Sequence, residues 1–387
     1  MKVLVLTSST GGGHDMRARS FKAWAESEAL SDMSLEVSLH ESLEGTSPIY
    51  TFGVWLYNWI QRTLPGLHHI YFNVLEVLPS CRSGKCMPGK ERFLKKLRAF
   101  KPDLVLSVHD HLNHGFFDLV RMAFPKNPPP CITYCGEYFG GYGFSRHWVN
   151  PKADHFFGAV QETCEAAAKL GMPPGHNDVG GLLLNPRFSA PKLSQEEKDN
   201  YIRDTWRLDP NKFILLLGTG ANAANNHRAS LEALIKSGVL PQVVALCGKD
   251  DEAKASLEAW ASENPGLPVR TLGYTEDMRP VMACASAIFA RPGTGTTSET
   301  IVSGCPIIFN GIGGVMPQEW ITVKFFRKHG IDYLARSPKA FARIVRIWMS
   351  QPRAFQSVRE ALEELPVAHD PEWLIRKMIA LAKKKKA

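Results

Sequence analysis

The most chemically suggestive part of this 387-residue chain is a loop rich in glycine and threonine. The apolar run Ser286–Ala290 predicts a buried strand, Pro292–Thr296 a turn, and Thr297–Ser303 a helix. A helix N-terminus offers backbone N–H groups and about half a positive charge, which suits a phosphate. Arg291 precedes the turn, and Glu299 lies one turn into the helix, where its carboxylate can accept hydrogen bonds from two sugar hydroxyls. The alternative is that the glycines only turn a tight corner and that Glu299 supports the helix N-terminus.

A second glycine-rich loop follows the first predicted strand, Lys2–Thr7. The three consecutive glycines Gly11–Gly13 let the backbone approach a ligand closely, and a helix predicted from Asp15 to about Ala29 would point its N-terminus at that ligand. Contiguous glycines differ from the G-x-G-x-x-G fingerprint, which disfavours a nicotinamide dinucleotide. His14 follows directly and is a candidate active-site residue, the alternative being that it only caps or packs the helix.

The same combination of strand, glycine-rich turn and helix occurs a third time. Phe213–Leu217 predicts a buried strand that runs into Gly218–Asn222. Further strands are predicted at Val243–Cys247, which ends before Lys249, and at Arg270–Gly273. This repeated alternation indicates a second doubly wound α/β domain, in which ligands bind at the carboxyl ends of the strands.

Composition sets outer limits on function. A chain of this length should form two domains, and its 44% hydrophobic and 22% charged residues are typical of a globular protein. The formal net charge of +8 favours anionic partners, namely nucleotides, nucleic acid or anionic lipid. No apolar run is long enough to span a bilayer, and Met1–Thr10 lacks a cleavage site, so we expect a cytoplasmic protein, either free or bound at a membrane surface.

A dense run of aromatic and aliphatic side chains extends over Tyr50–Leu78. An amphipathic helix that carries interfacial aromatics and a basic residue is typical of proteins that bind a membrane surface. The alternative is that these rings fill the domain core, as aromatic stripes more often do. Because tryptophan and tyrosine prefer interfaces, we take Trp55, Trp59 and Arg62 as candidates for the membrane side.

Two other predicted strands end in polar groups. Leu104–His109 ends in a histidine with Asp110 next to it, and Cys131–Cys135 precedes a loop that contains Glu137. The eight cysteines lack the spacing of common zinc knuckles, so we expect reduced thiols that pack in the interior. A metal site built from Cys81, Cys86 and His109 or His111 is the alternative.

The stretch from Arg291 to Glu319 resembles the nucleotide-sugar half of the monogalactosyldiacylglycerol synthase and processive diacylglycerol glucosyltransferase family, which is related to the peptidoglycan N-acetylglucosaminyltransferases. Those proteins carry a basic residue, a Gly/Ser/Thr loop, a glutamate on the next helix and a Gln-Glu pair, here Gln318 and Glu319. Three segments resemble the same family: Thr7–His14, the aromatic segment, and the Ser-Val-His that ends at His109. In that family the first histidine, here His14, belongs to the active site.

Two positions depart from the family pattern. The family's fourth strand usually ends in Thr-Asp, whereas Cys135 occupies that place here and Glu137 is the nearest carboxylate. The family also has an asparagine three residues beyond its Gln-Glu pair, where this chain has Thr322. These departures leave the general base and the sugar open.

The resemblance implies an α/β fold of the GT-B type, with two doubly wound Rossmann-like domains. We expect an N-terminal acceptor and membrane-side domain at 1–190, a UDP-sugar-binding domain at 191–365, and a C-terminal helix with a lysine tail at 366–387. It implies an inverting hexosyltransferase that moves sugar from a UDP-sugar to a lipid such as diacylglycerol, peripheral on the inner face of the cell membrane and without nucleic acid as partner. No essential metal is expected, since the chain contains no D-x-D pair.

Other functions stay open: a peptidoglycan-type UDP-GlcNAc transferase, a UDP-sugar epimerase, or a catalytically silent nucleotide-binding protein. The predicted site residues fall into three groups by role. The catalytic candidates are His14, Glu137 and Asp110. The candidates for donor binding are Gly11, Gly12, Gly13, Gly218, Thr219, Gly220, Lys249, Tyr274, Arg291, Gly293, Thr294, Gly295, Thr296, Thr297, Glu299, Gln318 and Glu319. The acceptor and membrane candidates are Trp55, Trp59, Arg62 and His109, and no metal ligand is predicted.

Overall fold

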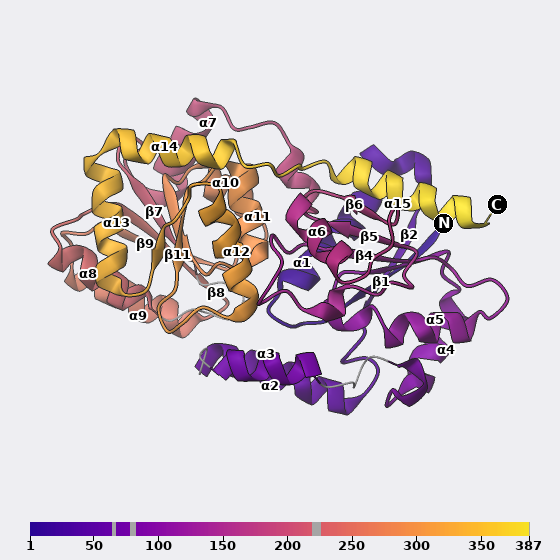
Figure 1. The fold of residues 1–387 in the computed structure, drawn as a ribbon. Helices are drawn as coiled ribbons and strands as arrows, with labels where there is room; N and C mark the ends of the chain where they lie inside the picture. Colours follow the sequence, from indigo (N-terminus) through magenta and orange to yellow (C-terminus); the bar gives the residue numbers. More distant parts are fainter. Residues whose placement is uncertain (64–66, 78–82, 219–225, 387) are drawn as a thin grey trace. The chain divides into compact units, whose positions relative to one another are not determined.

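The computed structural model describes residues 1–63, 67–77, 83–218 and 226–386. Residue contacts divide the chain into two compact units (Figure 1). The first comprises Met1–Pro186, Met316–Thr322 and Pro366–Ala387, and the second comprises Arg187–Val315 and Val323–Leu365. The domain boundaries expected from the sequence lay after residues 190 and 365; in the structure the C-terminal segment groups with the first unit.

The first unit contains a parallel sheet with the strand order β2-β1-β3-β4-β5-β6. Its strands are β1 (Lys2–Thr7), β2 (Glu36–Glu41), β3 (Leu104–Ser107), β4 (Cys131–Cys135), β5 (His155–Gly158) and β6 (Asn177–Val179). Its helices are α1 (Gly13–Ala25), α2 (Pro48–Thr63), α3 (His68–Val77), α4 (Lys90–Phe100), α5 (Gly115–Ala123), α6 (Gln161–Lys169) and α15 (Pro371–Lys386). Its shorter 3₁₀ turns are η1 (Glu28–Met33), η3 (Gly84–Cys86), η4 (Asp110–Leu112) and η5 (Arg146–Trp148), and a further turn, η6 (Pro186–Ser189), spans the point at which the chain passes into the second unit.

Helices cover both faces of this first sheet, as the continuous apolar runs of its strands predict. Alternate residues of β1 point to opposite sides, so Leu4 packs in one hydrophobic cluster and Val5 in another. The second of these clusters includes Leu374 and Met378 of α15. Apolar packing of α15 on the sheet therefore explains why the C-terminal segment belongs to the first unit.

The second unit contains a parallel sheet with the strand order β12-β11-β10-β7-β8-β9. Its strands are β7 (Ile214–Leu217), β8 (Gln242–Gly248), β9 (Val269–Gly273), β10 (Ala287–Ala290), β11 (Ile307–Asn310) and β12 (Leu334–Ala335). Its helices are α7 (Gln195–Tyr201), the π-helical turn η7 (Ile202–Trp206), α8 (His227–Lys236), α9 (Asp251–Glu263), α10 (Met278–Ala283), α11 (Thr294–Ser303), α13 (Pro338–Ser350) and α14 (Pro352–Glu363), together with the second half of α12 (Pro317–Lys328).

The two doubly wound sheets confirm the predicted fold class, and the strands predicted at Lys2–Thr7 and Cys131–Cys135 match β1 and β4 to the residue. Helix boundaries differ more. The first helix begins at Gly13 instead of Asp15 because Gly11 and Gly12, with φ of 68° and 79°, complete the turn within the glycine run. In the part of the chain that the structure describes, no helix combines the length and the apolar character that crossing a bilayer requires.

Candidate active site

The glycine loop of the first unit presents His14 in the first turn of α1. The ring nitrogen Nδ1 of His14 lies 2.8 Å from the carbonyl oxygen of Val108, which follows β3. A carbonyl oxygen only accepts hydrogen bonds, so Nδ1 carries the proton that it donates. The other ring nitrogen, Nε2, then bears a lone pair, which is the protonation state that a general base needs.

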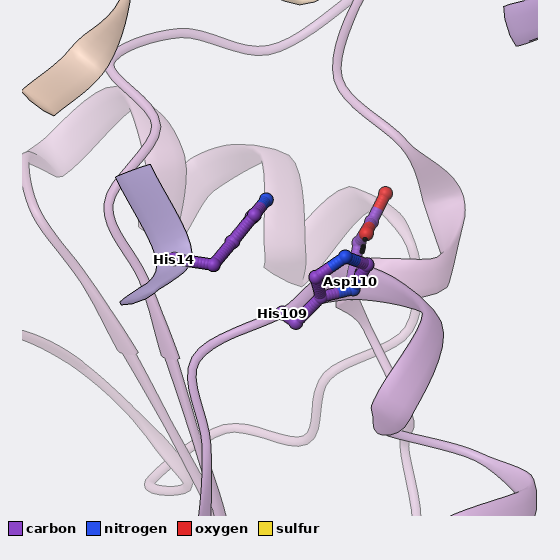
Figure 2. Close-up of side chains that lie close together, drawn as sticks. All are labelled: His14, His109 and Asp110. Carbon is purple, nitrogen blue, oxygen red and sulfur yellow. Dashed lines mark ion pairs between the residues drawn. The ribbon is translucent and has the colours of Figure 1, made fainter. Parts of the chain in front are cut away.

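His14 is one of three polar side chains that gather at the carboxyl ends of β1 and β3 (Figure 2). The ring centroids of His14 and His109 are 4.2 Å apart. Nδ1 of His109 lies 2.9 Å from Oδ1 of Asp110, and Nε2 of His109 lies 2.8 Å from the hydroxyl of Thr10. Both ring nitrogens of His109 therefore have partners, so its contact with Asp110 fixes the ring beside His14.

The electrostatics of this cluster keep its members in different charge states. Burial lowers the pKa of His14 well below its usual value, and the neighbouring His109 and Arg17 act in the same direction. Burial acts to raise the pKa of Asp110, yet His111 and His109 together hold it well below its usual range. At neutral pH the site therefore combines a neutral imidazole at His14 with an anionic carboxylate at Asp110.

The same three side chains are also the donor set of a metal site, because one ligand atom from each lies within 4.8 Å of the others. Imidazole and carboxylate donors would suit Zn²⁺ or a similar ion. In the structure, however, His109 uses its nitrogens for Asp110 and Thr10. A metal would have to displace one of those contacts, whereas proton transfer uses the arrangement as it stands.

Glu137, the second candidate for the base, lies in the loop after β4. Its side chain is buried, and its Oε2 has no hydrogen-bond partner. Burial raises the pKa of Glu137 to about 7, with Arg17 opposing this shift and Asp110 reinforcing it. Arg17 in turn donates to the carbonyl oxygen of Gly136 at 3.1 Å. Glu137 is thus half protonated near neutral pH, which suits a residue that exchanges protons.

In the second unit, the candidates for donor binding lie at the carboxyl ends of parallel strands. Arg291 follows β10 and donates from Nη1 to the carbonyl oxygens of Ile312 and Gly314, at 3.3 and 2.8 Å. It therefore anchors the glycine loop after β11 in addition to its predicted role toward phosphate. Lys249, after β8, places its ammonium 4.6 Å from the ring centroid of Tyr274, after β9. The structure thus brings these two predicted residues together.

Helix α11 starts three residues earlier than predicted, with Gly293 as its N-cap and Thr294, Gly295 and Thr296 as its first turn. The N–H of Thr297 donates to the carbonyl oxygen of Gly293 at 3.1 Å. The backbone N–H of Thr297 is therefore bonded within the helix, whereas its buried hydroxyl has no hydrogen-bond partner among the described residues.

Glu299 lies on the same helix, and burial raises the pKa of its carboxyl to about 7. Gly218 follows β7 and is buried, whereas the predicted donor residues Thr219 and Gly220 fall outside the described residues. Gln318 and Glu319 open α12 in the short segment that groups with the first unit. The Oε2 of Glu319 accepts the N–H of Met316 at 2.9 Å, so this carboxylate also caps the helix.

The aromatic segment forms α2 and α3, with one side packed and the other exposed. Tyr50 and Val54 are buried in the hydrophobic core of the first unit. In contrast, Trp55 and Trp59 are 56% and 41% exposed, with ring centroids 6.4 Å apart. The two tryptophans are therefore surface residues, and the alternative that they fill the core is wrong. The side chain of Arg62 lies outside the described residues.

Reasoning from the sequence missed two residues that support the cluster of His14, His109 and Asp110 or lie beside Glu137. Thr10 contacts His109, and the buried Arg17 lies against the backbone of Gly136. A Cβ on Gly136 would come within 2.1 Å of Nε of Arg17, so the glycine makes room for the guanidinium. A basic residue one turn into the helix after a glycine loop is a weak signal, because most such side chains face solvent.

Comparison with known proteins gives a family match and a relative by sequence. Residues 214–310 match the glycosyltransferase family 28 C-terminal domain. Over 386 residues, the chain is 23% identical to the processive diacylglycerol beta-glucosyltransferase of Staphylococcus aureus (strain Newman), an alignment that covers 98% of this chain and 93% of the relative.

Solved structures that are similar over the whole chain show the same fold at low sequence identity. MurG of Acinetobacter baumannii is 16% identical with a TM-score of 0.61, covering 99% of both chains. A UDP-glucosyltransferase from Polygonum tinctorium is 11% identical with a TM-score of 0.61, covering 100% of this chain and 99% of the other. The UDP-GlcNAc 2-epimerase of Neisseria meningitidis is 13% identical with a TM-score of 0.58, covering 98% of this chain and 100% of the other.

The family match covers the second sheet from β7 to β11, which contains the predicted donor-binding loops. The relative by sequence extends that similarity to nearly the whole chain. This protein is a glycosyltransferase of the GT-B fold, and its second sheet matches the glycosyltransferase family 28 C-terminal domain.

Proposed function

We propose that this glycosyltransferase moves a hexose from a UDP-sugar, with inversion, to the hydroxyl of a membrane lipid such as diacylglycerol. The observation that carries the proposal is the combination, within one unit, of a neutral histidine in a glycine loop with an exposed aromatic helix face. Similarity to a diacylglycerol glucosyltransferase over 98% of the chain supports the choice of acceptor.

The donor would bind at the carboxyl ends of the second sheet. The pyrophosphate needs positive charge, and the N-termini of two helices supply about half a charge each. Arg291 follows β10 and Lys249 follows β8, the two strands that flank β7, and their side chains would supply the remainder, so the proposal requires no divalent metal. Glu299 would accept hydrogen bonds from the ribose hydroxyls, while Gln318 and Glu319 would contact the sugar.

The acceptor hydroxyl must lose a proton as it attacks the anomeric carbon, and His14 would take it at Nε2. The inversion follows from a single displacement, in which the new bond forms opposite the departing UDP. Glu137 and Asp110 are the alternative bases. Asp110 fits this role less well, because its low pKa makes it a weak proton acceptor.

A lipid acceptor stays in its bilayer, so the first unit would dock on the inner face of the cell membrane through α2 and α3. Their exposed apolar side chains would enter the interface, and the net charge of +8 favours an anionic surface. The lysine tail contributes less than its sequence suggests, because Lys385 pairs with Asp154. Figure 1 draws α15 above the first sheet and α2 and α3 below it, so the tail lies away from the aromatic face.

The direct test is to incubate the pure protein with labelled UDP-glucose, UDP-galactose or UDP-GlcNAc, with and without diacylglycerol vesicles. Transfer of label to diacylglycerol supports the proposal. Label on a peptidoglycan-type lipid acceptor would indicate the UDP-GlcNAc transferase instead. A changed sugar without any acceptor would indicate the UDP-sugar epimerase, and binding without turnover would indicate the catalytically silent protein. A nucleic-acid partner is not part of the proposal.

Replacing Arg291 with alanine, or Glu299 with alanine, is expected to weaken UDP binding by about 1.5–3 kcal/mol, the usual value of a charge-assisted hydrogen bond. Titration calorimetry, with and without magnesium, measures this loss. Arg343→Ala, which removes an exposed arginine on α13 of the same unit, serves as the matched control. Unchanged UDP affinity in both variants, or strict dependence on magnesium, would rule out the donor site assigned here.

Donor binding should also depend on pH through Glu299. Its free pKa is about 7, and hydrogen bonds from ribose hydroxyls would favour the ionised form and lower that pKa. The affinity for the donor should therefore decrease by roughly tenfold for each pH unit below about 7. Above about pH 7 it should be constant. UDP-glucose is the suitable probe, because its phosphates do not titrate near neutral pH. Glu299→Gln should bind more weakly with no such slope; a slope that persists in this variant would assign it to another group.

A further inference from the structure

The side chain of Asn58, in the middle of α2, holds the glycine loop with both ends of its amide. Its Oδ1 accepts the N–H of Gly11 at 3.3 Å, and its Nδ2 donates to the carbonyl oxygen of Ser9 at 3.0 Å. The amide of Asn58 can make both hydrogen bonds in one orientation only, with its oxygen toward the N–H of Gly11 and its nitrogen toward the carbonyl oxygen of Ser9. The loop therefore has a specific attachment to α2, which is separate in sequence by 47 to 49 residues.

This attachment lies where the loop conformation matters most. Gly11 has a φ of 68°, and His14 follows three residues later in the first turn of α1. A Cβ on Gly11 would lie 3.5 Å from the hydroxyl oxygen of Tyr57, so the loop also lies directly against α2. Ser9 has a second contact besides Asn58, since its N–H donates to Oε1 of Glu44 at 2.8 Å. A shift of α2 would thus pull on the loop at both Ser9 and Gly11, and Gly11 is the nearer of the two to His14 in the sequence.

The same helix turn carries the exposed aromatic face. Trp55 precedes Asn58 by three residues and Trp59 follows it by one, so the tryptophans and the amide share a single turn of α2. Helix α3 is attached to the preceding turn of α2, because the Tyr71 hydroxyl donates to the carbonyl oxygen of Gly53 at 3.1 Å. The exposed tryptophans and the amide that holds Gly11 therefore belong to the same short stretch of helix, Trp55–Trp59.

We propose that Asn58 is a positioning residue that couples docking of α2 on a lipid surface to the placement of His14. The inference rests on the proposed lipid acceptor for its membrane part, whereas the attachment of the loop rests on the hydrogen bonds alone. When α2 seats on the bilayer, Asn58 sets the glycine loop, and His14 reaches the position from which it takes the acceptor's proton.

The test compares two acceptors for the wild type, Asn58→Ala and Asn58→Asp: long-chain diacylglycerol in vesicles and a short-chain diacylglycerol dissolved as monomers. In the wild type, kcat with vesicles should exceed kcat with monomers. Asn58→Ala should lower the vesicle kcat by about tenfold to a hundredfold, the loss typical of a misplaced catalytic group, and bring the two values together. The KM for the UDP-sugar and the affinity for vesicles should not change. Asn58→Asp keeps the acceptor for the Gly11 N–H and should lose less.

A purely structural role would lower both activities in proportion, together with the melting temperature, and would overturn the inference. So would an unchanged ratio of vesicle to monomer activity in Asn58→Ala. If Asn58→Ala is too unstable to assay, the ratio of vesicle to monomer activity in Asn58→Asp tests the inference in the same way. Failure of the proposed function is distinguishable, because the wild type itself would then transfer sugar to neither acceptor, and both proposals would fall.

Discussion

His14→Ala is expected to lower kcat by about 10²–10⁴-fold, the usual loss when a general base is removed. The reason is the hydrogen bond to Val108, which holds the proton on Nδ1 and leaves the Nε2 lone pair for the acceptor hydroxyl. UDP binding should be unaffected if His14 acts only on the proton. Steady-state kinetics beside UDP calorimetry checks both parts, and added imidazole should restore some activity to the variant.

The pH dependence of kcat separates His14 from Glu137 as the base. A base must be unprotonated, so the rate rises as pH passes through the pKa of that group. If His14 is the base, the rise lies at acidic pH, because its pKa is well below the usual histidine value. If Glu137 is the base, the rise is centred near pH 7, where its own pKa lies. Glu137→Gln should then abolish both the rise and most of the rate.

Full activity of His14→Ala would exclude His14 from catalysis altogether. A variant with weakened UDP binding and a smaller loss in kcat would place His14 against the donor phosphate instead. If kcat of Glu137→Gln still rises with a midpoint near pH 7, neither the carboxyl of Glu137 nor the imidazole of His14 determines the pH dependence of kcat. Each of these outcomes assigns a different role to the glycine loop.

The sequence predicted the strands and loops of this fold well, because buried parallel strands are continuous apolar runs that are bounded by glycine. Lys2–Thr7 and Cys131–Cys135 are strands to the residue, and Gly304 ends its helix in the left-handed conformation at φ 63°. The predicted starting residues of the helices were less accurate than the predicted strands. α11 begins at Thr294 because the hydroxyl-rich turn is itself helical, and local composition does not distinguish a capping turn from the first helical turn.

The chemistry of the site was harder to predict, since it depends on burial and on contacts between distant residues. Asp110 and Glu137 are both carboxyls after neighbouring strands, yet their pKa values shift in opposite directions. The difference arises because Asp110 contacts two histidines, whereas Oε2 of Glu137 has no hydrogen-bond partner. Neither set of neighbours follows from strand order alone. The sequence therefore identified the candidate groups but not their charge states.

The aromatic segment shows a similar limit. Its period predicted an amphipathic helix, and the helix is present as α2. Whether its tryptophans pack inward or face solvent depends on which side meets the sheet, and the sequence left that choice open. The structure exposes Trp55 and Trp59 and buries Val54 and Ile60. That outcome removes unfolding as the expected result of changing the tryptophans.

Replacing both Trp55 and Trp59 with serine is accordingly expected to abolish transfer to diacylglycerol in vesicles while UDP binding and folding are retained. Each lysine of the tail supplies only about 1 kcal/mol on an anionic leaflet. Lys385 supplies less, because it is engaged with Asp154. Apolar insertion, at about 0.8 kcal/mol per buried methylene equivalent, must provide most of the attachment. Two indole rings are the largest such groups on the exposed side of α2.

Two controls make this result specific. Trp373→Ser removes a tryptophan that is 45% exposed on α15 of the same unit, and it should leave vesicle binding and activity unchanged. Deleting the tail from Lys383 onward should weaken binding modestly and mainly at low salt, since charge attraction to the leaflet is screened within about 10 Å at 0.1 M salt. Vesicle sedimentation, circular dichroism and transfer assays cover the three variants. If the double variant folds normally and still binds neutral vesicles and glycosylates diacylglycerol at the wild-type rate, the membrane role proposed for this face of α2 is wrong, because its two exposed tryptophans would then be dispensable for transfer to the lipid.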